Sequence, residues 1–288
     1  MELFTIEHLR CSYNKPFVEG RSRVVLEIER LVLERGKRIF IVGESGIGKS
    51  TILETLGMMN DTVVEDKRTR FMFHDADGHE TDLLSLWQGG DSLLSSFRLK
   101  NYSFIFQSTN LMRNFTAYEN VAYTRMLQGY SRQECFERTK QVLESLGLER
   151  VDEQRMTQEL SGGQQQRLAF ARAILPDYTV LFGDEPTGNL DPENAMRVMK
   201  ILVQKTAEQK NSSAIIVSHD MHLATSFADV IIKIHKQKKA KLHDEEEEET
   251  YGMINETCVF YPNATRSLWT NGDSKYNTVE FEEYLRKK

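Results

Sequence analysis

The segment Gly43-Glu44-Ser45-Gly46-Ile47-Gly48-Lys49-Ser50 has the residue types and the spacing of a phosphate-binding loop. Its glycines lack a Cβ, so successive backbone N–H groups can curl around phosphate oxygens. Lys49 brings a cation to the β- and γ-phosphates, and the hydroxyl of Ser50 is suited to ligate Mg²⁺. The segment therefore predicts a site for a nucleoside triphosphate.

Regular elements are predicted on both sides of this loop. Residues 38–42 are largely apolar and predict a short buried strand. Residues 51–56 predict the first turns of a helix, whose positive end would face the phosphates. The order of strand, loop and helix argues against a chance glycine-rich turn.

Two adjacent carboxylates, Asp184 and Glu185, follow the apolar residues 179–182. In P-loop enzymes an Asp at the end of such a strand holds Mg²⁺ through its water shell. Glu185 is placed to polarise an attacking water. An isolated acidic pair would more simply cap a helix, but after a phosphate loop this pair indicates nucleotide hydrolysis.

The pentapeptide Leu160-Ser161-Gly162-Gly163-Gln164, together with the loop and the acidic pair, resembles the ATP-binding cassette (ABC) ATPase family. Other motifs match in the family's order. Gln107 resembles the Q-loop glutamine, Asn189-Leu190-Asp191 the D-loop, and His219 the switch histidine. Tyr13 stands where the family has an aromatic that stacks on adenine. Alone, His219 would be read as an ordinary strand-end histidine and Tyr13 as a core residue.

This resemblance implies a fold and a mode of action. The fold would be an α/β P-loop NTPase over residues 1–243, with a mainly parallel core sheet, an N-terminal antiparallel β subdomain and an inserted α-helical subdomain at about 109–175. The cofactors would be ATP and Mg²⁺. Two copies would form a head-to-tail homodimer on ATP binding, because Ser161 opens a helix whose first N–H groups form an anion site for the other copy's ATP. Hydrolysis would remove interface contacts and open the dimer.

The resemblance also implies roles for single residues. Catalysis would depend on Lys49, Gln107, Glu185 and His219. Ser50, Gln107 and Asp184 would hold Mg²⁺, and Asp191 would cross the dimer seam. The residues implied to bind ATP are Tyr13, Gly43, Ser45, Gly46, Gly48, Lys49, Ser50, Thr51, Ser161, Gly162, Gly163, Gln164 and Asp191.

Three longer segments, 106–111, 114–121 and 184–191, resemble the bacterial subfamily that serves lipoprotein release, macrolide export and cell division. Such ATPases drive a separate integral-membrane, permease-like partner, often without moving solute. The chain would then be cytoplasmic and peripheral on the inner face of the cell membrane. Residues 58–100 are longer and less regular than in the family, and 244–288 have no counterpart, so cargo and partner identity stay open.

Composition excludes several other classes. The 288 residues carry a net charge of −6, which argues against a nucleic-acid partner. No apolar stretch is long enough for a membrane span, and the N-terminus has no signal-peptide pattern. Three widely spaced cysteines fit a reducing compartment without a disulfide framework. Two alternatives remain: a soluble ABC ATPase acting on nucleic acid or ribosomes, and an ATP-dependent scaffold, as in a cell-division complex.

The remaining elements are predicted from periodicity and turn residues. We predict strands at 24–29, 31–33 and 214–217, and helices at 119–127, 131–146, 164–175, 192–209 and 221–227. Residues 58–106 predict a β-rich insertion around Gly89-Gly90. Residues 231–234 and 240–243 predict a closing hairpin, and 244–249 an acidic, solvated linker. Residues 250–288 are too aromatic for simple disorder, yet we expect ATPase activity to survive their deletion.

Overall fold

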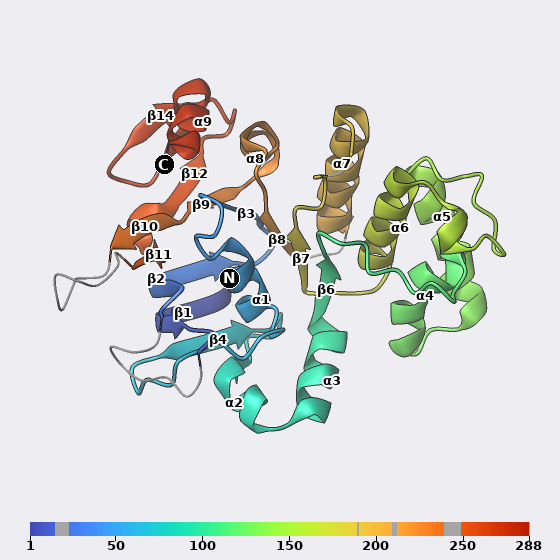
Figure 1. Cartoon of the computed structure of the whole chain (residues 1–288), viewed down its shortest axis with the longest axis horizontal. Helices are drawn as coiled ribbons and strands as arrows, with labels where there is room; N and C mark the ends of the chain where they lie inside the picture. Colours follow the sequence, from blue (N-terminus) through green and yellow to red (C-terminus); the bar gives the residue numbers. More distant parts are fainter. Residues whose placement is uncertain (15–22, 189, 209–211, 239–248, 288) are drawn as a thin grey trace. The chain divides into compact units, whose positions relative to one another are not determined.

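The computed structural model describes residues 1–14, 23–188, 190–208, 212–238 and 249–287. The chain forms two compact units, each described here by itself (Figure 1). Unit 1 comprises Met1–Leu94 and Val217–Lys288, and unit 2 comprises Ser95–Ile216. Unit 1 is therefore assembled from the two ends of the sequence.

Unit 1 is built on two runs of paired strands, with the orders β10-β11-β2-β1-β4-β5 and β14-β13-β12-β9-β3. In the first run β1, β2 and β4 pair antiparallel, which confirms the predicted N-terminal β subdomain. Among the strands that the structure describes in this run, β11 joins in parallel, beside β2. The strands are β1 (Glu2–Cys11), β2 (Leu26–Glu34), β3 (Arg38–Val42), β4 (Arg70–His74), β5 (Glu80–Asp82), β9 (Val230–Lys233), β10 (His235–Lys238), β11 (Thr250–Ile254), β12 (Val259–Pro262), β13 (Leu268–Thr270) and β14 (Lys275–Asn277).

The element that leads into the phosphate loop is the buried strand β3. Four of its five residues are inaccessible to solvent, and it runs parallel to β9. Helix α1 (Lys49–Leu56) follows the loop and buries Ile52, Leu53 and Leu56. A strand buried along its length holds the loop's first residue firmly, because shifting it would expose several apolar side chains.

The predicted β-rich insertion is partly wrong. Strands β4 and β5 are present, but the residues around Gly89-Gly90 join two helices, α2 (Leu83–Gln88) and α3 (Asp91–Asn101). Asp82 caps α2 by accepting a hydrogen bond from the N–H of Leu84. Gly90 has φ +90° and, with Gly89, forms the short link between these two helices.

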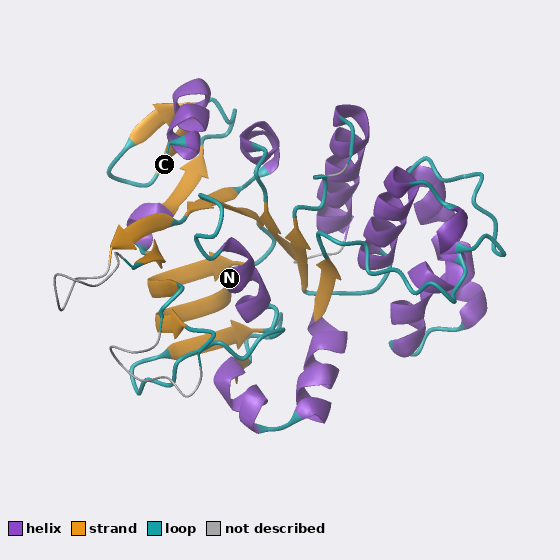
Figure 2. Cartoon of the chain, in the orientation of Figure 1, coloured by secondary structure: helices purple, strands orange, loops and turns teal. Residues whose placement is uncertain are grey.

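Unit 2 places helices beside a parallel group of strands in the order β8-β7-β6 (Figure 2). The predicted helices are confirmed to within a few residues at each end. A capping box between Thr116 and Glu119 starts α4, and Gly147, with φ +69°, follows the end of α5. The elements are β6 (Tyr102–Ile105), α4 (Ala117–Leu127), α5 (Arg132–Ser145), the short helix η1 (Thr157–Glu159), α6 (Gly162–Ile174), β7 (Val180–Asp184), α7 (Pro192–Glu208) and β8 (Ser213–Val217).

The C-terminal part of unit 1 has its own aromatic core. Trp269 and Phe281 are fully buried and stack with their ring centroids 5.0 Å apart, and the ring of Phe260 lies 4.9 Å from that of Phe281. This core packs against β9 and α8 (Met221–Phe227) through β12 and α9 (Thr278–Arg286). Removing these residues would uncover apolar surface, so the structure contradicts the reason for expecting a tolerated deletion.

The predicted hairpin partner of β9 at 240–243 lies outside the described residues, as does most of the acidic run 244–249. Instead, β10 pairs antiparallel with β11, and the short helix η2 (Glu256–Cys258) leads on to β12. All three cysteines are buried and free of disulfide bonds. Among the helices that the structure describes, none has both the length and the apolar composition of a bilayer span.

Candidate nucleotide site

The phosphate loop has the conformation that its glycines were expected to provide. Gly46 and Gly48 have φ values of +76° and +102°, a region that L side chains rarely adopt. Lys49 is only 6% exposed, and its Nζ donates to the carbonyl oxygens of Gly43, at 3.0 Å, and of Glu44, at 2.6 Å. The ammonium is thus held across the loop, where it can meet phosphate oxygens. The residues present fit a bound triphosphate.

Tyr13 lies next to the helix that follows the loop. Its Oη is 3.1 Å from Oγ1 of Thr51, and its side chain is 58% exposed. Tyr13 and Gly46 line one pocket of about 310 Å³, together with Asn14, Arg23, Val25 and Thr250. A large exposed ring beside a phosphate loop can offer its face to a planar base. Ser45 is exposed in the loop itself, and Ser50 is exposed at the start of α1.

His219 also belongs to unit 1, just beyond the end of β8. The preceding residue, Ser218, donates its N–H to the carbonyl oxygen of Ile41 in β3, at 3.3 Å. Asp220 then caps α8 by accepting from the N–H of Leu223. These bonds hold the backbone on both sides of His219 beside the strand that leads into the phosphate loop, and the residue is exposed.

Unit 2 brings the carboxylate pair and Gln107 to one edge of its parallel strands. Ile105 in β6 pairs with Gly183 in β7, so Gln107 and Asp184 both emerge at the carboxyl ends of neighbouring strands. Glu185 follows in a left-handed conformation with φ +49°. Such backbone strain in a residue other than glycine costs about 1–2 kcal/mol and concentrates at functional sites.

Ser161 is the N-cap of α6 and is exposed. Its hydroxyl accepts from the N–H of Gln164, and the Gln164 side chain accepts from the N–H of Ser161 at 2.8 Å. Gly162 and Gly163 form the first turn, where backbone N–H groups have no partner within the helix. The helix start can therefore bind an anion, with Gln164 shaping the cap.

The structure divides the predicted residues between the units. Unit 1 holds Tyr13, the loop with Thr51, and His219, whereas unit 2 holds Gln107, Ser161 to Gln164, Asp184, Glu185 and Asp191. Asn189 of the predicted D-loop lies outside the described residues. Hydrogen bonds from the side chain and backbone of Asn194 lower the pKa of Asp191, which keeps it a carboxylate.

Two residues near the site were missed by the sequence reasoning. Thr250 lines the pocket of Tyr13, and Gly252 packs against Ile47 of the loop. The signal was a glycine inside a strand-like run, Tyr251-Gly252-Met253, since such a glycine often marks a close backbone approach.

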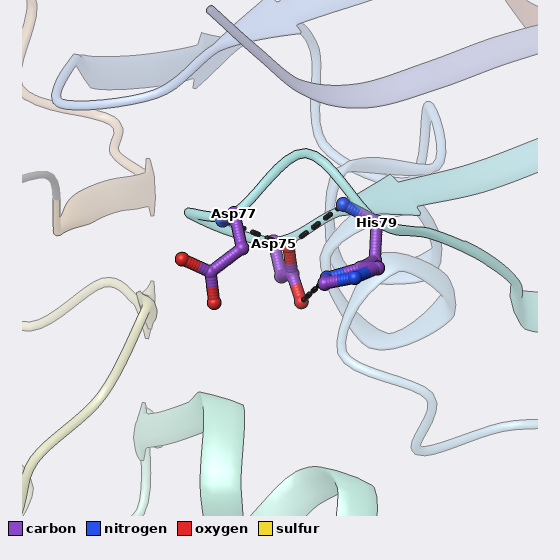
Figure 3. A group of neighbouring side chains, drawn as sticks. All are labelled: Asp75, Asp77 and His79. Atoms are coloured by element: carbon purple, nitrogen blue, oxygen red, sulfur yellow. Dashed lines mark hydrogen bonds and ion pairs between the residues drawn. The ribbon is translucent and has the colours of Figure 1, made fainter.

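Within the described residues, one group of three His, Cys, Asp or Glu side chains has ligand atoms close enough for a metal ion: Asp75, Asp77 and His79 (Figure 3). It lies on the turn between β4 and β5 and includes none of the residues predicted to hold Mg²⁺. Oδ1 of Asp75 accepts from the N–H groups of Asp77 and His79, both at 2.9 Å. These bonds explain the arrangement as a capped turn.

The chain is similar in sequence to known proteins. The family profile described as "ABC transporter" matches residues 27–188. The macrolide export ATP-binding/permease protein MacB of Aggregatibacter actinomycetemcomitans is 39% identical over 77% of this chain, which spans about a third (32%) of that protein. The lipoprotein-releasing system ATP-binding protein LolD of Myxococcus xanthus is 35% identical over 78% of this chain and 93% of its own length.

Two solved structures of another protein have a similar fold. The dimeric structure of MJ0796, a bacterial ABC transporter cassette, has a TM-score of 0.66 and 28% identity, over 80% of this chain and 94% of that one. A post-hydrolysis dimer of the same cassette, bound to ADP and Pi, has a TM-score of 0.64 with the same identity and coverage.

Proposed function

The chain belongs to the ABC transporter family of ATPases, and from this we propose that it binds and hydrolyses ATP to drive a separate membrane protein. We infer that two copies close head-to-tail around two Mg²⁺–ATP. The observation that carries the proposal is that one chain has two elements with backbone N–H groups suited to bind a phosphate: the loop that holds Lys49 in unit 1, and the exposed start of α6 at Ser161 in unit 2. One element would bind the chain's own ATP, and the other the ATP of a second copy.

Each candidate residue has a role in this proposal. Lys49 and the loop hold the β- and γ-phosphates, and the ring of Tyr13 meets the adenine. Glu185 orients the attacking water, and His219 holds the γ-phosphate. Mg²⁺ would be held by Ser50, Gln107 and Asp184, and Asp191 would cross the seam to the second copy. Gly43, Ser45, Gly46, Gly48, Thr51, Gly162, Gly163 and Gln164 complete the nucleotide contacts.

The segment after Gln107 is the candidate docking place for the membrane partner. It lines a groove of about 540 Å³ in unit 2 that includes Leu111, Arg113 and Gln165. Arg172 of α6 donates to the carbonyl oxygens of Asn110, at 2.7 Å, and of Thr109, at 2.8 Å. A partner seated in the groove would therefore push on the helix that starts at Ser161. We place the chain on the inner face of the cell membrane, held there by that partner, with residues 1–243 as the ATPase domain, to whose sheets β11 and β12 add strands.

Purification tests this proposal directly. The Glu185→Gln variant, tagged and isolated from membranes with ATP, is expected to retain an integral-membrane protein. The purified variant is expected to elute as a dimer with ATP and as a monomer without it. A variant that stays monomeric with ATP would contradict the head-to-tail dimer. ATPase activity stimulated by RNA or ribosomes, and by no membrane fraction, would favour the soluble alternative.

A further inference from the structure

The strand pair β10–β11 lies against the phosphate loop, although it comes from the far end of the sequence. β11 pairs antiparallel with β10 on one side and parallel with β2 on the other. The N–H of Gly252 in β11 donates to the carbonyl oxygen of Val25, at 2.9 Å. This bonding fixes the position of Gly252 from both sides.

Gly252 is buried where no side chain fits. A Cβ at this position would run into the backbone oxygen of Ile47, which belongs to the loop. It would also come within 2.9 Å of Cγ2 of Ile234 and 3.2 Å of Cδ1 of Leu26. A side chain can turn away from a new methyl group, but the carbonyl of Ile47 moves only with the loop backbone.

A second contact reaches the loop on its other side. Nζ of Lys236 in β10 lies 3.3 Å from Oε2 of Glu44, the second residue of the loop. The Lys236 side chain is half exposed, so this ion pair alone is weak. Thr250, two residues before Gly252, lines the same pocket as Tyr13 and Gly46. The strand pair thus contacts the loop at Glu44 and Ile47 and forms part of the pocket.

The residues after β11 hold it in place. Ile254, the last residue of β11, and Cys258 beyond it are fully buried, and Sγ of Cys258 lies 3.8 Å from Nδ1 of His235 in β10. The chain then enters β12, which pairs with β9 in the sheet that contains β3. Because β3 leads into the phosphate loop, the same C-terminal segment supports both β11 and the strand that begins the loop.

We propose that β10–β11 positions the phosphate loop for the nucleotide, and that Gly252 is the positioning residue. The inference rests on the proposed ATP site, and it assigns part of that site's affinity to the C-terminal segment. Replacing Gly252 by any larger residue would displace Ile47 and, with it, the N–H groups beside Gly46 and Gly48. The loop would then bind phosphates less well even in a correctly folded protein.

The test compares two glycine variants of the full chain. Gly252→Ala is expected to raise the Kd for ATP, and for tripolyphosphate as a base-free probe, by about tenfold or more. Gly272→Ala is the matched control, because Gly272 lies in the turn between β13 and β14 with φ +94° and open space around it. It should strain the same segment and leave both Kd values unchanged. A purely structural role would reduce the folded fraction without changing the Kd of the folded protein.

Unchanged affinity in folded Gly252→Ala would overturn the inference while leaving the proposed function intact. Failure of the wild-type chain to bind ATP would contradict both the inference and the proposed function. If circular dichroism shows that Gly252→Ala does not fold, the inference is tested with Lys236→Glu instead. This variant replaces the ion pair with Glu44 by a repulsion between two carboxylates beside the loop. It should raise the Kd for ATP at least about threefold over Lys238→Glu, two residues along the same strand. Equal Kd values for these two variants would also overturn the inference.

Discussion

The Thr225 hydroxyl in α8 donates a 2.8 Å hydrogen bond to Oε1 of Glu282 in α9, and Nδ1 of His222 lies 3.4 Å from the same oxygen. The last helix of the chain is thereby joined to the helix that starts just after His219. We predict that Glu282→Ala lowers the free energy of unfolding by about 1 kcal/mol, because it removes the charged acceptor of the Thr225 hydroxyl, which then keeps only the carbonyl oxygens of Met221 and His222. Urea titration measures this, with the exposed Glu283→Ala as control. Equal midpoints for the two variants would argue against the contact.

Lys49→Ala is predicted to weaken ATP binding by at least about a hundredfold. The substitution removes a cation that is 6% exposed and hydrogen-bonded inside the loop, and such desolvated charges contribute several kcal/mol to phosphate binding. Titration with a fluorescent ATP analogue measures the effect. Lys37→Ala, on the exposed turn before β3, is the control. Unchanged affinity in Lys49→Ala would refute the loop assignment.

Glu185→Gln is predicted to bind ATP normally and to lose turnover by a factor of about 10² to 10⁴, the usual contribution of a general base. The amide keeps the shape of the side chain but cannot accept a proton from water. Phosphate release measures turnover, and gel filtration with ATP should reveal an accumulated dimer. Glu193→Gln, on the exposed first turn of α7, should leave both unchanged. Wild-type turnover in Glu185→Gln would mean that another group activates water.

Ser161→Ala separates helix capping from dimerisation. The substitution removes an N-cap, which costs about 1 kcal/mol, and also removes the hydroxyl proposed to meet the second copy's ATP. Ser131→Ala removes the N-cap of α5 in the same unit, so a similar loss of stability is expected. In the Glu185→Gln background, only Ser161→Ala should abolish the ATP-dependent dimer. If both variants dimerise equally, the head-to-tail arrangement is wrong.

Acidification is predicted to destabilise unit 1 through His235. Burial, and then the positive charge of Lys233, lower the pKa of this imidazole below its ordinary 6.5. As pH falls below 6.5, His235 is protonated more readily in the unfolded chain than in the folded chain, so the free energy of unfolding decreases. The melting temperature should fall between pH 7.5 and pH 5.5, and it should fall less in His235→Gln than in the wild type. The exposed His79→Gln should behave as wild type, and identical pH profiles for all three proteins would exclude this origin.

A second acid-sensitive group acts in a different range. Although burial opposes the shift, hydrogen bonds from Arg38 lower the pKa of Asp229 below its ordinary 3.8. The stability that this carboxylate contributes is therefore present at neutral pH and is lost only below about 3.8. Measurements above pH 5 thus report on His235 without interference from Asp229.

The loop around Lys49 and the helix start at Ser161 could be predicted from sequence because each depends on adjacent residues. Glycine conformation, capping and strand-end carboxylates are local properties. The order of the motifs then linked them to one family. The helix pair α2–α3 was missed because Asp82, which caps the first helix, was not recognised as a helix start. Glycine at a turn fits a hairpin or a helix end equally well.

The pairing of β11 with β2 could not be predicted. It depends on contacts between Gly252 and Leu26, whose positions in the sequence are separated by the whole of unit 2. The burial of Trp269 could not be predicted in detail either. Its aromatic side chain indicates that the segment packs somewhere, but the sequence does not show against which residues. ATPase activity was expected to survive deletion of the segment because the resemblance to the family ends before it, whereas its strands belong to the sheets that support the loop.

Because unit 1 combines residues before and after unit 2 in the sequence, the pairing of β2 with β11 can form only after residues 250–254 have been synthesised. Contacts between residues so far apart in sequence form slowly, since a long loop must close before any stabilisation is gained. A ribosome-bound chain that already carries Lys49 still lacks the strand that lies beside Ile47. Translation products that stop before β11 are consequently expected to be poor at retaining nucleotide.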